Sequence, residues 1–299
     1  MASETLSKAG PVTKESYTLL QQKKTRQRLY QLLVYLLLLV LGALFALPLV
    51  WMLSTALKSN DQLIVFPPIW IPKPLMWENF PQAWQYAPFG TYLLNTLVVT
   101  MVALLGQVLS ASFVAYGFAR LRFPGREQLF VIVLATMMLP YIVTLVPIFL
   151  IFRNLGWIDT YLPLTVPHYF GGGPFFIFLL RQYFRTIPME LSDAARIDGA
   201  GEFGIFFRII IPLSLPALAT VCIFSFLGHW NDFLGPLIYI NSEEKKTLML
   251  GLQSFIGLHN QRFQYLMAMS TLITLPTLIL FFLFQRVFIR SIVLTGMKG

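Results

Sequence analysis

Long apolar segments alternate with short polar ones along almost the whole chain. A bilayer core about 30 Å thick requires roughly 20 helical residues at about 1.5 Å each. Six segments qualify: 31–57, 92–119, 128–152, 161–180, 209–231 and 264–285. None of them contains Asp, Glu, Lys or Arg. The pattern predicts an all-α membrane protein with six transmembrane helices, the fourth interrupted by Pro163, Pro167 and the stretch 171–174.

The basic residues concentrate on one side of these segments. They gather in the N-terminal stretch, in the loops after the second and fourth segments, and near the C-terminus. The positive-inside rule therefore predicts a multi-pass protein of the cell membrane with both termini cytoplasmic. We expect residues 1–28 to be a cytoplasmic tail, flexible or partly helical, and residues 29–299 to be the six-span domain. The first apolar segment is too long for the core of a secretory signal, so we expect it to be retained.

Composition excludes several classes of protein. Of the 299 residues, 57% are hydrophobic and 12% are charged, and no soluble domain needs so much apolar surface. The net charge is +9, and the basic residues that produce it border the membrane segments, which favours a lipid bilayer over nucleic acid as partner. The single Cys222 cannot form an intrachain disulfide. His168, His229 and His259 show no metal-ligand spacing, so no metal site is expected.

Motifs that carry catalysis are missing from the sequence. It has no G-x-x-x-x-G-K-[ST], no G-x-S-x-G and no H-E-x-x-H pattern, so we do not expect an enzyme. An ion-coupled carrier would place ionisable residues within its spans, and these spans have none. The sequence favours a pore-forming subunit driven by a separate motor protein. A scaffold or channel without a motor is the main alternative, and a membrane enzyme ranks last.

The polar loop at about 184–208 carries its own helix signal. Pro188 suits a first helical position, and Glu190 and Asp193 lie where the helix dipole favours anions. One helical face gathers small and apolar side chains: Leu191, Ala194 and Ala195. Glycines that can end or bend the helix follow: Gly199, Gly201 and Gly204. A face of alanines would let the backbone of another protein approach closely.

This spacing resembles the signature of permeases of ATP-binding-cassette importers, Glu-Ala-Ala, then Gly, then Ile-x-Leu-Pro. The matching positions are Asp193, Ala194, Ala195, Gly199, Ile209, Ile211 and Pro212. Asp193 replaces the usual glutamate and Ile211 the usual leucine. The resemblance implies a coupling helix that docks on an ATPase subunit, with these coupling residues: Glu190, Asp193, Ala194, Ala195, Asp198 and Gly199. The alternative is an interfacial amphipathic helix with no partner.

Three further segments, 177–201, 230–252 and 291–299, resemble the sugar-importing branch, specifically the maltose-type subunit that pairs with a different permease. The likeness covers most of the chain beyond residue 31. It implies a second permease in a heterodimer, two ATP-binding subunits that hold ATP and Mg, an extracytoplasmic solute-binding protein and a carbohydrate substrate. In that branch the region of the charged turn 243–246 includes a loop that enters the binding protein. A solvated turn is the alternative.

A neutral sugar requires amides and aromatic faces along its path. The candidates are Asn95, Tyr141, Trp230, Asn231 and Asp232, with Gln107 and His229 beside them. Interhelical hydrogen bonding, worth about 0.6 kcal/mol, is the alternative for the Asn95 and Gln107 amides. An interfacial belt is the alternative for Trp230. The partner permease can also carry most sugar contacts. An importer of a polyamine or phosphonate would need charged residues in its path, and the spans offer none.

Overall fold

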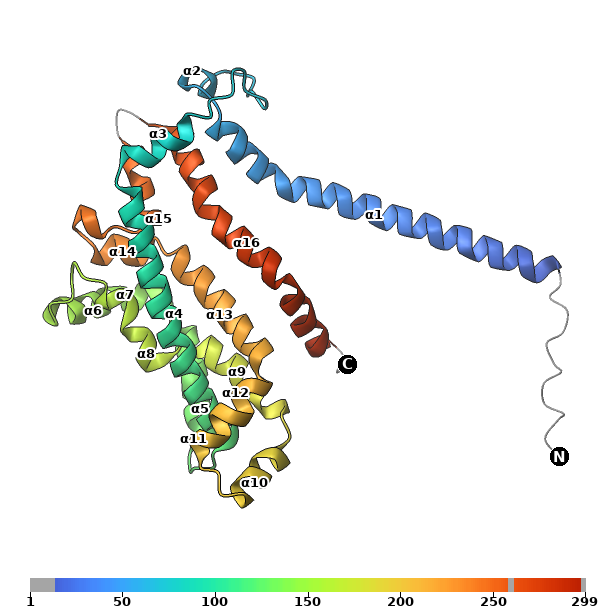
Figure 1. Cartoon of the computed structure of the whole chain (residues 1–299), viewed down its shortest axis with the longest axis vertical. Coiled ribbons are helices and arrows are strands. Elements are labelled where there is room, and N and C mark those ends of the chain that lie inside the picture. The colour runs from blue at the N-terminus through green and yellow to red at the C-terminus, as the bar shows by residue number, and fades with distance from the viewer. Residues whose placement is uncertain (1–13, 258–260, 297–299) are drawn as a thin grey trace. The chain divides into compact units, whose positions relative to one another are not determined.

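The computed structural model describes residues 14–257 and 261–296 (Figure 1). Every regular element in these ranges is a helix, apart from one isolated antiparallel bridge between Ile256 and Gln261. Internal contacts divide the chain into two units, residues 1–54 and 55–299. Helix α1 (Lys14–Ala56) forms all of the described part of the first unit and ends two residues into the second. Part of the predicted tail is therefore helical, and residues 1–13 lie outside the described residues.

Three stretches are continuous helices that are long and apolar enough to cross a bilayer. They are Arg26–Ala56 in α1, all of α4 (Phe89–Arg120), and Phe263–Gln285 in α16 (Phe263–Gly296). Two more pass the same test only as sharply bent pairs, which gives up to five spans in the described residues. The all-helical membrane fold agrees with the sequence, and the crossing number of six stays a prediction.

The third predicted segment is not one straight helix. It is divided into α5 (Arg126–Ala135), a 3₁₀ turn η1 (Thr136–Met138) and α6 (Tyr141–Asn154), with a bend of 99°. The break falls at Pro140, which has no N–H to donate and disfavours helical geometry at the residue before it. Leu139 accordingly adopts an extended backbone. The sequence pattern predicts an interruption only in the fourth segment, and the structure has one in this segment as well.

No continuous helix covers the fourth predicted segment, 161–180. The chain forms α7 (Leu162–Thr165), α8 (Pro167–Gly171) and then α9 (Pro174–Thr186). Gly172 and Gly173 separate α8 from α9 in left-handed or otherwise positive-φ backbone. The interruption predicted from the prolines and glycines is therefore present, and it leaves α9 as the longest helix of this segment.

The fifth segment also bends. The polar loop before it holds α10 (Met189–Ile197) and α11 (Glu202–Ile205). The segment itself runs from the end of a π-helical turn η2 (Phe206–Ile210) through α12 (Ile211–Leu213) into α13 (Leu215–Trp230). The bend between Glu202–Leu213 and α13 is 80°. Pro212 and Pro216 lie on either side of it, and each removes a backbone donor from the helix.

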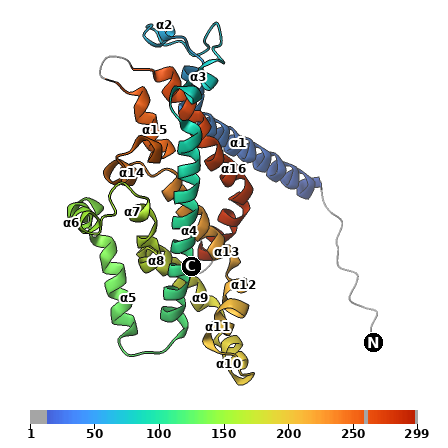
Figure 2. The same ribbon diagram turned by 60° about the vertical axis from the view of Figure 1, so that its left-hand side comes forward.

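Helix α4 is the central element of the second unit, and α8, α9 and α13 pack against it (Figure 2). Small residues permit this approach. A Cβ at Gly106 would lie 2.4 Å from the Tyr169 ring of α8, and one at Gly172 would lie 2.4 Å from the Ala111 backbone nitrogen. Apolar clusters fill the space along α4: one around Leu180, Phe184, Ile210 and Val221, one around Phe89, Tyr92, Trp230 and Met269, and one around Val99, Leu164 and Tyr239.

The short helices α2 and α3 lie at the end of α4 opposite α10 (Figure 1). Their bounds are Asn60–Leu63 for α2 and Asn79–Tyr86 for α3. Further along the chain, α14 (Leu234–Tyr239) packs on α7, η3 (Glu243–Lys245) and α15 (Leu248–Gly251) pack on α4, and η4 (Leu252–Phe255) packs on α16. Asn79 is buried, and its side-chain amide donates to the carbonyls of Ala56 at 2.8 Å and Lys58 at 2.9 Å. This amide fixes the start of the connection to α3.

Candidate functional site

Two features of the second unit can carry function, and the first is the segment around α10. The helix begins at Met189, directly after Pro188, and has Glu190 in its first turn and Arg196 in its last. Asp198 caps it, and Gly199 follows with a φ of +83°. The Gly199 N–H donates to Arg196 O and the Ala200 N–H to Ala195 O. This pair of bonds is a Schellman motif, which ends a helix at a left-handed residue, usually glycine.

One face of α10 is bare. Leu191 and Ala194 are exposed, and Ile197 is 86% exposed, although such side chains normally avoid water. Ala195 turns toward the cluster around Leu180 and Phe184, and Ser192 is fully buried. The sequence placed Leu191, Ala194 and Ala195 on one face, and the structure keeps the first two on the surface.

The predicted acidic residues of this segment are all exposed: Glu190, Asp193 and Asp198. Asp193 pairs within the segment, because Arg196 Nη1 donates to its Oδ1 at 2.7 Å. Arg196 Nε also donates to Glu202 Oε1 at 2.9 Å. The Glu202 hydrogen bond, with help from Asp193, raises the pKa of the Arg196 guanidinium. Asp193 and Glu202 are therefore linked through one arginine across the Gly199 turn.

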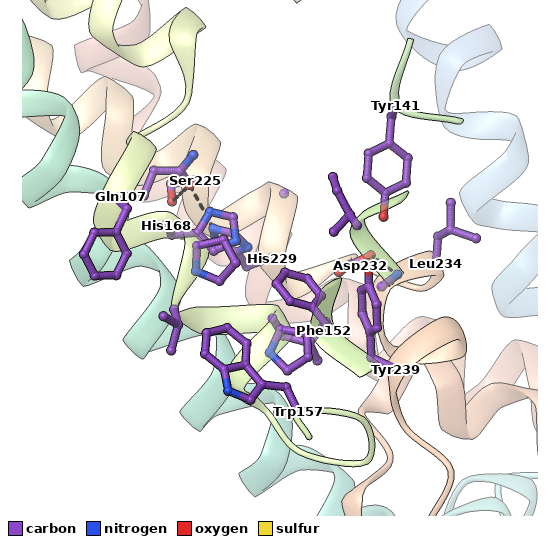
Figure 3. A pocket seen from close by; sticks show the side chains of 18 of the residues that line it. Gln107, Tyr141, Phe152, Trp157, His168, Ser225, His229, Asp232, Leu234 and Tyr239 are labelled. Atoms are coloured by element: carbon purple, nitrogen blue, oxygen red, sulfur yellow. Dashed lines mark hydrogen bonds between the residues drawn. The ribbon is translucent and has the colours of Figure 1, made fainter. Parts of the chain in front are cut away.

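The second feature is a cavity of about 840 Å³ beside α4 and α13 (Figure 3). Its wall is mostly apolar and aromatic, and Phe152, Trp157 and Tyr239 contribute rings to it. Asp232 is the one charged side chain among the described residues that line it. Cavities of this size with a few polar groups are typical of small-ligand sites.

A polar cluster lies in one wall of the cavity. Gln107 Oε1 accepts a hydrogen bond from Ser225 Oγ at 2.8 Å and lies 2.8 Å from His229 Nε2 (Figure 3). An amide oxygen can only accept, so this contact requires His229 Nε2 to donate, and in the neutral ring Nδ1 is then an acceptor. The His168 ring stands edge-on to that of His229, with centroids 4.4 Å apart. The wall therefore offers neutral donors and acceptors.

The structure brings two of the five predicted path residues, Tyr141 and Asp232, to this cavity. Asp232 Oδ1 also accepts from the Gly235 N–H at 3.0 Å, which positions the start of α14. Gln107 and His229, the further candidates, line the cavity too. The sequence missed Phe152, Trp157 and Tyr239, because only the bend at Pro140 and the turns after α6 and α13 bring them together.

The other three predicted path residues lie elsewhere. Trp230 is 2% exposed, stacks on Phe226 and donates its indole N–H to Ile273 O at 3.0 Å. Asn231 is exposed and donates to Leu227 O at 2.9 Å. Asn95 hydrogen-bonds to the backbone of the 243–246 turn. None of these three lines the cavity.

The charged turn 243–246 is fixed at several points. Asn95 Nδ2 donates to Glu244 O at 2.8 Å and to Lys246 O at 2.9 Å, and the Tyr92 hydroxyl bonds Glu243. Asp159 accepts from the backbone N–H groups of 241 and 242 at 3.0 and 2.8 Å, and from Lys245 Nζ at 3.0 Å. The Ser242 hydroxyl also donates to Asp159. This bond makes the largest contribution to the shift, and together with the others it holds the pKa of Asp159 well below its usual range. The turn is therefore a rigid platform.

Comparison with known proteins supplies the family. Residues 107–293 match the family described as binding-protein-dependent transport system inner membrane component. The arabinooligosaccharides transport system permease protein AraQ of Bacillus subtilis (strain 168) is 34% identical over 273 residues, which cover 90% of this chain and 96% of AraQ. The diacetylchitobiose uptake system permease protein NgcG of Streptomyces coelicolor (strain ATCC BAA-471 / A3(2) / M145) is 32% identical over 261 residues, 87% of this chain and 86% of NgcG.

A solved structure shares the fold. It is a chain from the crystal structure of a bacterial ABC transporter involved in the import of the acidic polysaccharide alginate. The TM-score is 0.75 at 22% sequence identity, and the match covers 87% of this chain and 97% of that one. The bent and broken helices of the second unit therefore belong to an architecture that is known from an importer.

Proposed function

We propose, because this chain belongs to the family of inner membrane components of binding-protein-dependent transport systems, that it is a permease subunit of an ATP-driven carbohydrate importer. Two relatives with similar lengths are named for arabinooligosaccharides and diacetylchitobiose. This chain would form half of the path, and a second, different permease the other half. Two separate subunits would bind ATP with Mg and hydrolyse it, and a solute-binding protein would deliver the sugar.

The bare face of α10 is the observation that carries the coupling role. Leu191, Ala194 and Ile197 stand exposed on a short helix that a Schellman motif ends sharply. A cleft on an ATPase subunit would cover these apolar groups. Under this proposal the acidic residues Glu190, Asp193 and Asp198 border the contact, with the network to Arg196 holding Asp193 in place.

The proposal also sets the orientation in the membrane. The α10 segment would lie in the cytoplasm, because Arg185, Arg196 and Arg208 are in or beside it and basic loops stay inside. Both termini would lie on the same side, with six crossings in total. The 243–246 platform would then face outward, where a solute-binding protein docks.

The cavity favours an uncharged substrate over an anionic one. A sugar presents hydroxyl groups along its edges and apolar C–H faces, which suit the Gln107 and His229 cluster and the aromatic rings respectively. A substrate with a phosphate or carboxylate would need a cationic residue, and the described lining has no Lys or Arg. Because this chain supplies only half of the path, the partner permease would complete the site.

The test is ATP hydrolysis by the complex that copurifies with this chain, reconstituted in lipid. We expect stimulation by one sugar-loaded binding protein. Ala194→Glu should lose the ATPase subunits, because it adds a charge to the apolar contact. Ala194→Ser is the matched control, because it keeps a small side chain at the same exposed position, and it should retain them.

Two outcomes would reject this function. If no ATPase subunit copurifies with the wild-type chain after gentle extraction, or if flux of sugar does not depend on ATP, a channel or scaffold without a motor is favoured. If a charged compound such as a polyamine or phosphonate alone stimulates hydrolysis, the importer design holds and the carbohydrate assignment is wrong.

A further inference from the structure

The end of α4 nearest α10 carries two buried polar side chains one helical turn apart. Tyr116 is 5% exposed and Arg120 is 3% exposed. Residues four apart lie on the same face of a helix. Both side chains therefore point in one direction; Arg120 reaches the segment before α10, and Tyr116 reaches the segment after it.

Arg120 holds the segment that precedes α10. Its Nη2 donates to Phe184 O at 2.6 Å, near the end of α9, and to Ile187 O at 2.7 Å, two residues before the helix starts. Nη1 contacts the Met189 sulfur at 2.8 Å. The Nε of Arg120 is buried with no hydrogen-bond partner among the described residues. A buried guanidinium with one unsatisfied nitrogen is costly, so packing alone does not account for it.

Tyr116 holds the segment that follows α10. Its hydroxyl donates to Glu202 Oε2 at 2.5 Å, at the first residue of α11. The other oxygen of Glu202 accepts from Arg196 Nε, and Arg196 bonds Asp193 within α10. A continuous series of hydrogen bonds therefore connects Asp193 on the exposed helix to the buried hydroxyl on α4.

The same helix continues to the cavity. Gln107 lies nine residues before Tyr116 on α4, roughly 14 Å along the axis at about 1.5 Å per residue. α4 is one unbroken helix without proline between these residues. Gln107 contacts Ser225 and His229 of α13 in the cavity wall. A shift of α4 along or across α13 would therefore change this contact directly.

We propose that Tyr116 and Arg120 form a two-point clamp that transmits displacement of α10 to α4, and through α4 to the Gln107 wall of the cavity. Both are positioning residues, because neither reaches the bare face of α10 or the cavity. The proposal rests on the proposed function, in which an ATPase subunit moves α10. One buried anchor would leave the segment free to pivot, whereas anchors on both sides make α10 and α4 move together.

The experiment uses the full complex of this chain with its second permease, ATPase subunits and binding protein, in lipid. Tyr116→Phe removes the hydroxyl, and Glu202→Gln removes the carboxylate charge that accepts from both Tyr116 and Arg196, while both keep side-chain shape. Tyr265→Phe is the matched control, because it removes a hydroxyl that donates to Gln82 Oε1 at 2.6 Å, away from α10. Three quantities are measured: retention of the ATPase subunits with thermal stability, sugar transported per ATP hydrolysed, and the reactivity of a cysteine at the exposed α4 position Met101. The Met101→Cys label is read in a Cys222→Ser background.

We expect both clamp variants to keep their ATPase subunits and stability but to transport at least about fivefold less sugar per ATP, as loss of a bond to a charged group allows. The double variant should lose no more than Glu202→Gln alone, since the Tyr116 hydroxyl acts through Glu202. In the wild type and in Tyr265→Phe, reactivity at Met101→Cys should change between the nucleotide-free and vanadate-trapped states. This change should shrink in the clamp variants. Arg120→Lys keeps the charge but loses the branched guanidinium that reaches the two carbonyls, and it should behave like the clamp variants.

Three results would overturn the clamp. Clamp variants with sugar per ATP within about twofold of wild type and an unchanged Met101→Cys response would show that the bonds carry no motion. Loss of stability or of ATPase subunits in proportion to lost transport would make Tyr116 and Arg120 structural supports only. A wild-type complex without ATPase subunits would overturn the proposed function itself, and the clamp with it. This result is seen in the wild type, before any variant is compared.

Discussion

Gly199 shows how a single residue determines where the exposed helix stops. Its φ of +83° lies in the region that L side chains avoid, and its N–H closes one bond of the Schellman pair. Nothing lies within 4 Å of a Cβ built at this position. Any cost of substitution therefore comes from the backbone and not from a clash, which makes the position suitable for a graded test.

We expect an ordered series of effects at Gly199. Gly199→Asn should be mild, because asparagine adopts left-handed backbone readily, and Gly199→Ala should destabilise the helix end by about 1–2 kcal/mol. Gly199→Pro should be worst, because it fixes φ near −65° and removes the N–H that Arg196 O accepts. Amide exchange at 198–200 and retention of ATPase subunits measure the series. Wild-type behaviour of Gly199→Pro would refute it.

Asp159 makes a prediction about pH. Its pKa is lowered in the folded protein, so its contribution is present at pH values above the ordinary aspartate pKa of about 3.9 and is lost as pH falls through the folded pKa. Exchange protection of the amides at 241 and 242 should therefore be constant from about pH 8 to 5. Asp159→Asn should lose protection throughout that range, because Lys245 loses its charged partner. If the protection of both amides in the wild type fell as the pH was lowered across that range, this account would be contradicted.

At the scale of elements, the break between α8 and α9 depends on its contact with α4. Gly172 has a φ of +53°, and a Cβ there would lie 2.4 Å from the Ala111 nitrogen, which belongs to helix backbone and cannot swing aside. Gly171, its neighbour, has nothing within 4 Å of a Cβ. The two glycines are adjacent in sequence but differ in what an added methyl group would meet.

This difference gives a paired prediction. Gly172→Ala should destabilise the protein by about 1–3 kcal/mol, since both overpacking and left-handed backbone act against it. Gly171→Ala should be neutral or slightly stabilising, because it lies at the end of α8 in open space. Thermal unfolding of the purified complex compares the two. Equal midpoints for both variants would mean that α8 and α9 do not pack on α4 as described.

Local signals explain which elements the sequence could predict. Pro188 and Gly199 each restrict or permit particular backbone angles at their own position, whatever packs around them. The start and end of α10 could therefore be predicted from the order of residues alone. The break at Pro140 was equally visible as a proline, yet Pro48 in α1 and Pro147 in α6 lie inside helices. A proline therefore signals a possible break, and its tertiary surroundings decide whether the chain turns by 99°.

At the scale of the whole molecule, the cavity is a product of tertiary structure. Phe152, Trp157 and Tyr239 are each unremarkable in sequence, and two of them fall outside every predicted span. They converge because the chain bends by 99° between α5 and α6 and α14 follows α13 after a short turn. Trp230 looked equally suitable by residue type but turns into the core toward Ile273. Residue type alone therefore could not separate path from packing.

The separation of the two sites along α4 leads to a final prediction. Trp157 lines the cavity and stacks on Phe152, with ring centroids 5.4 Å apart. Trp157→Ala should reduce sugar transport about fivefold, within the range expected for one aromatic contact of 0.5–1.5 kcal/mol, and Trp157→Phe should restore much of it. ATPase subunits should stay bound, because α10 is untouched.

Trp77→Ala is the matched control, since Trp77 is exposed and does not line the cavity. Transport and subunit retention should both stay near wild type. Radiolabelled sugar uptake into proteoliposomes, with subunit ratios from the same preparation, compares the two tryptophans. Loss of ATPase subunits in Trp157→Ala would mean that the cavity wall and α10 are not independent binding sites. Equal transport in both tryptophan variants would remove the cavity from the sugar path.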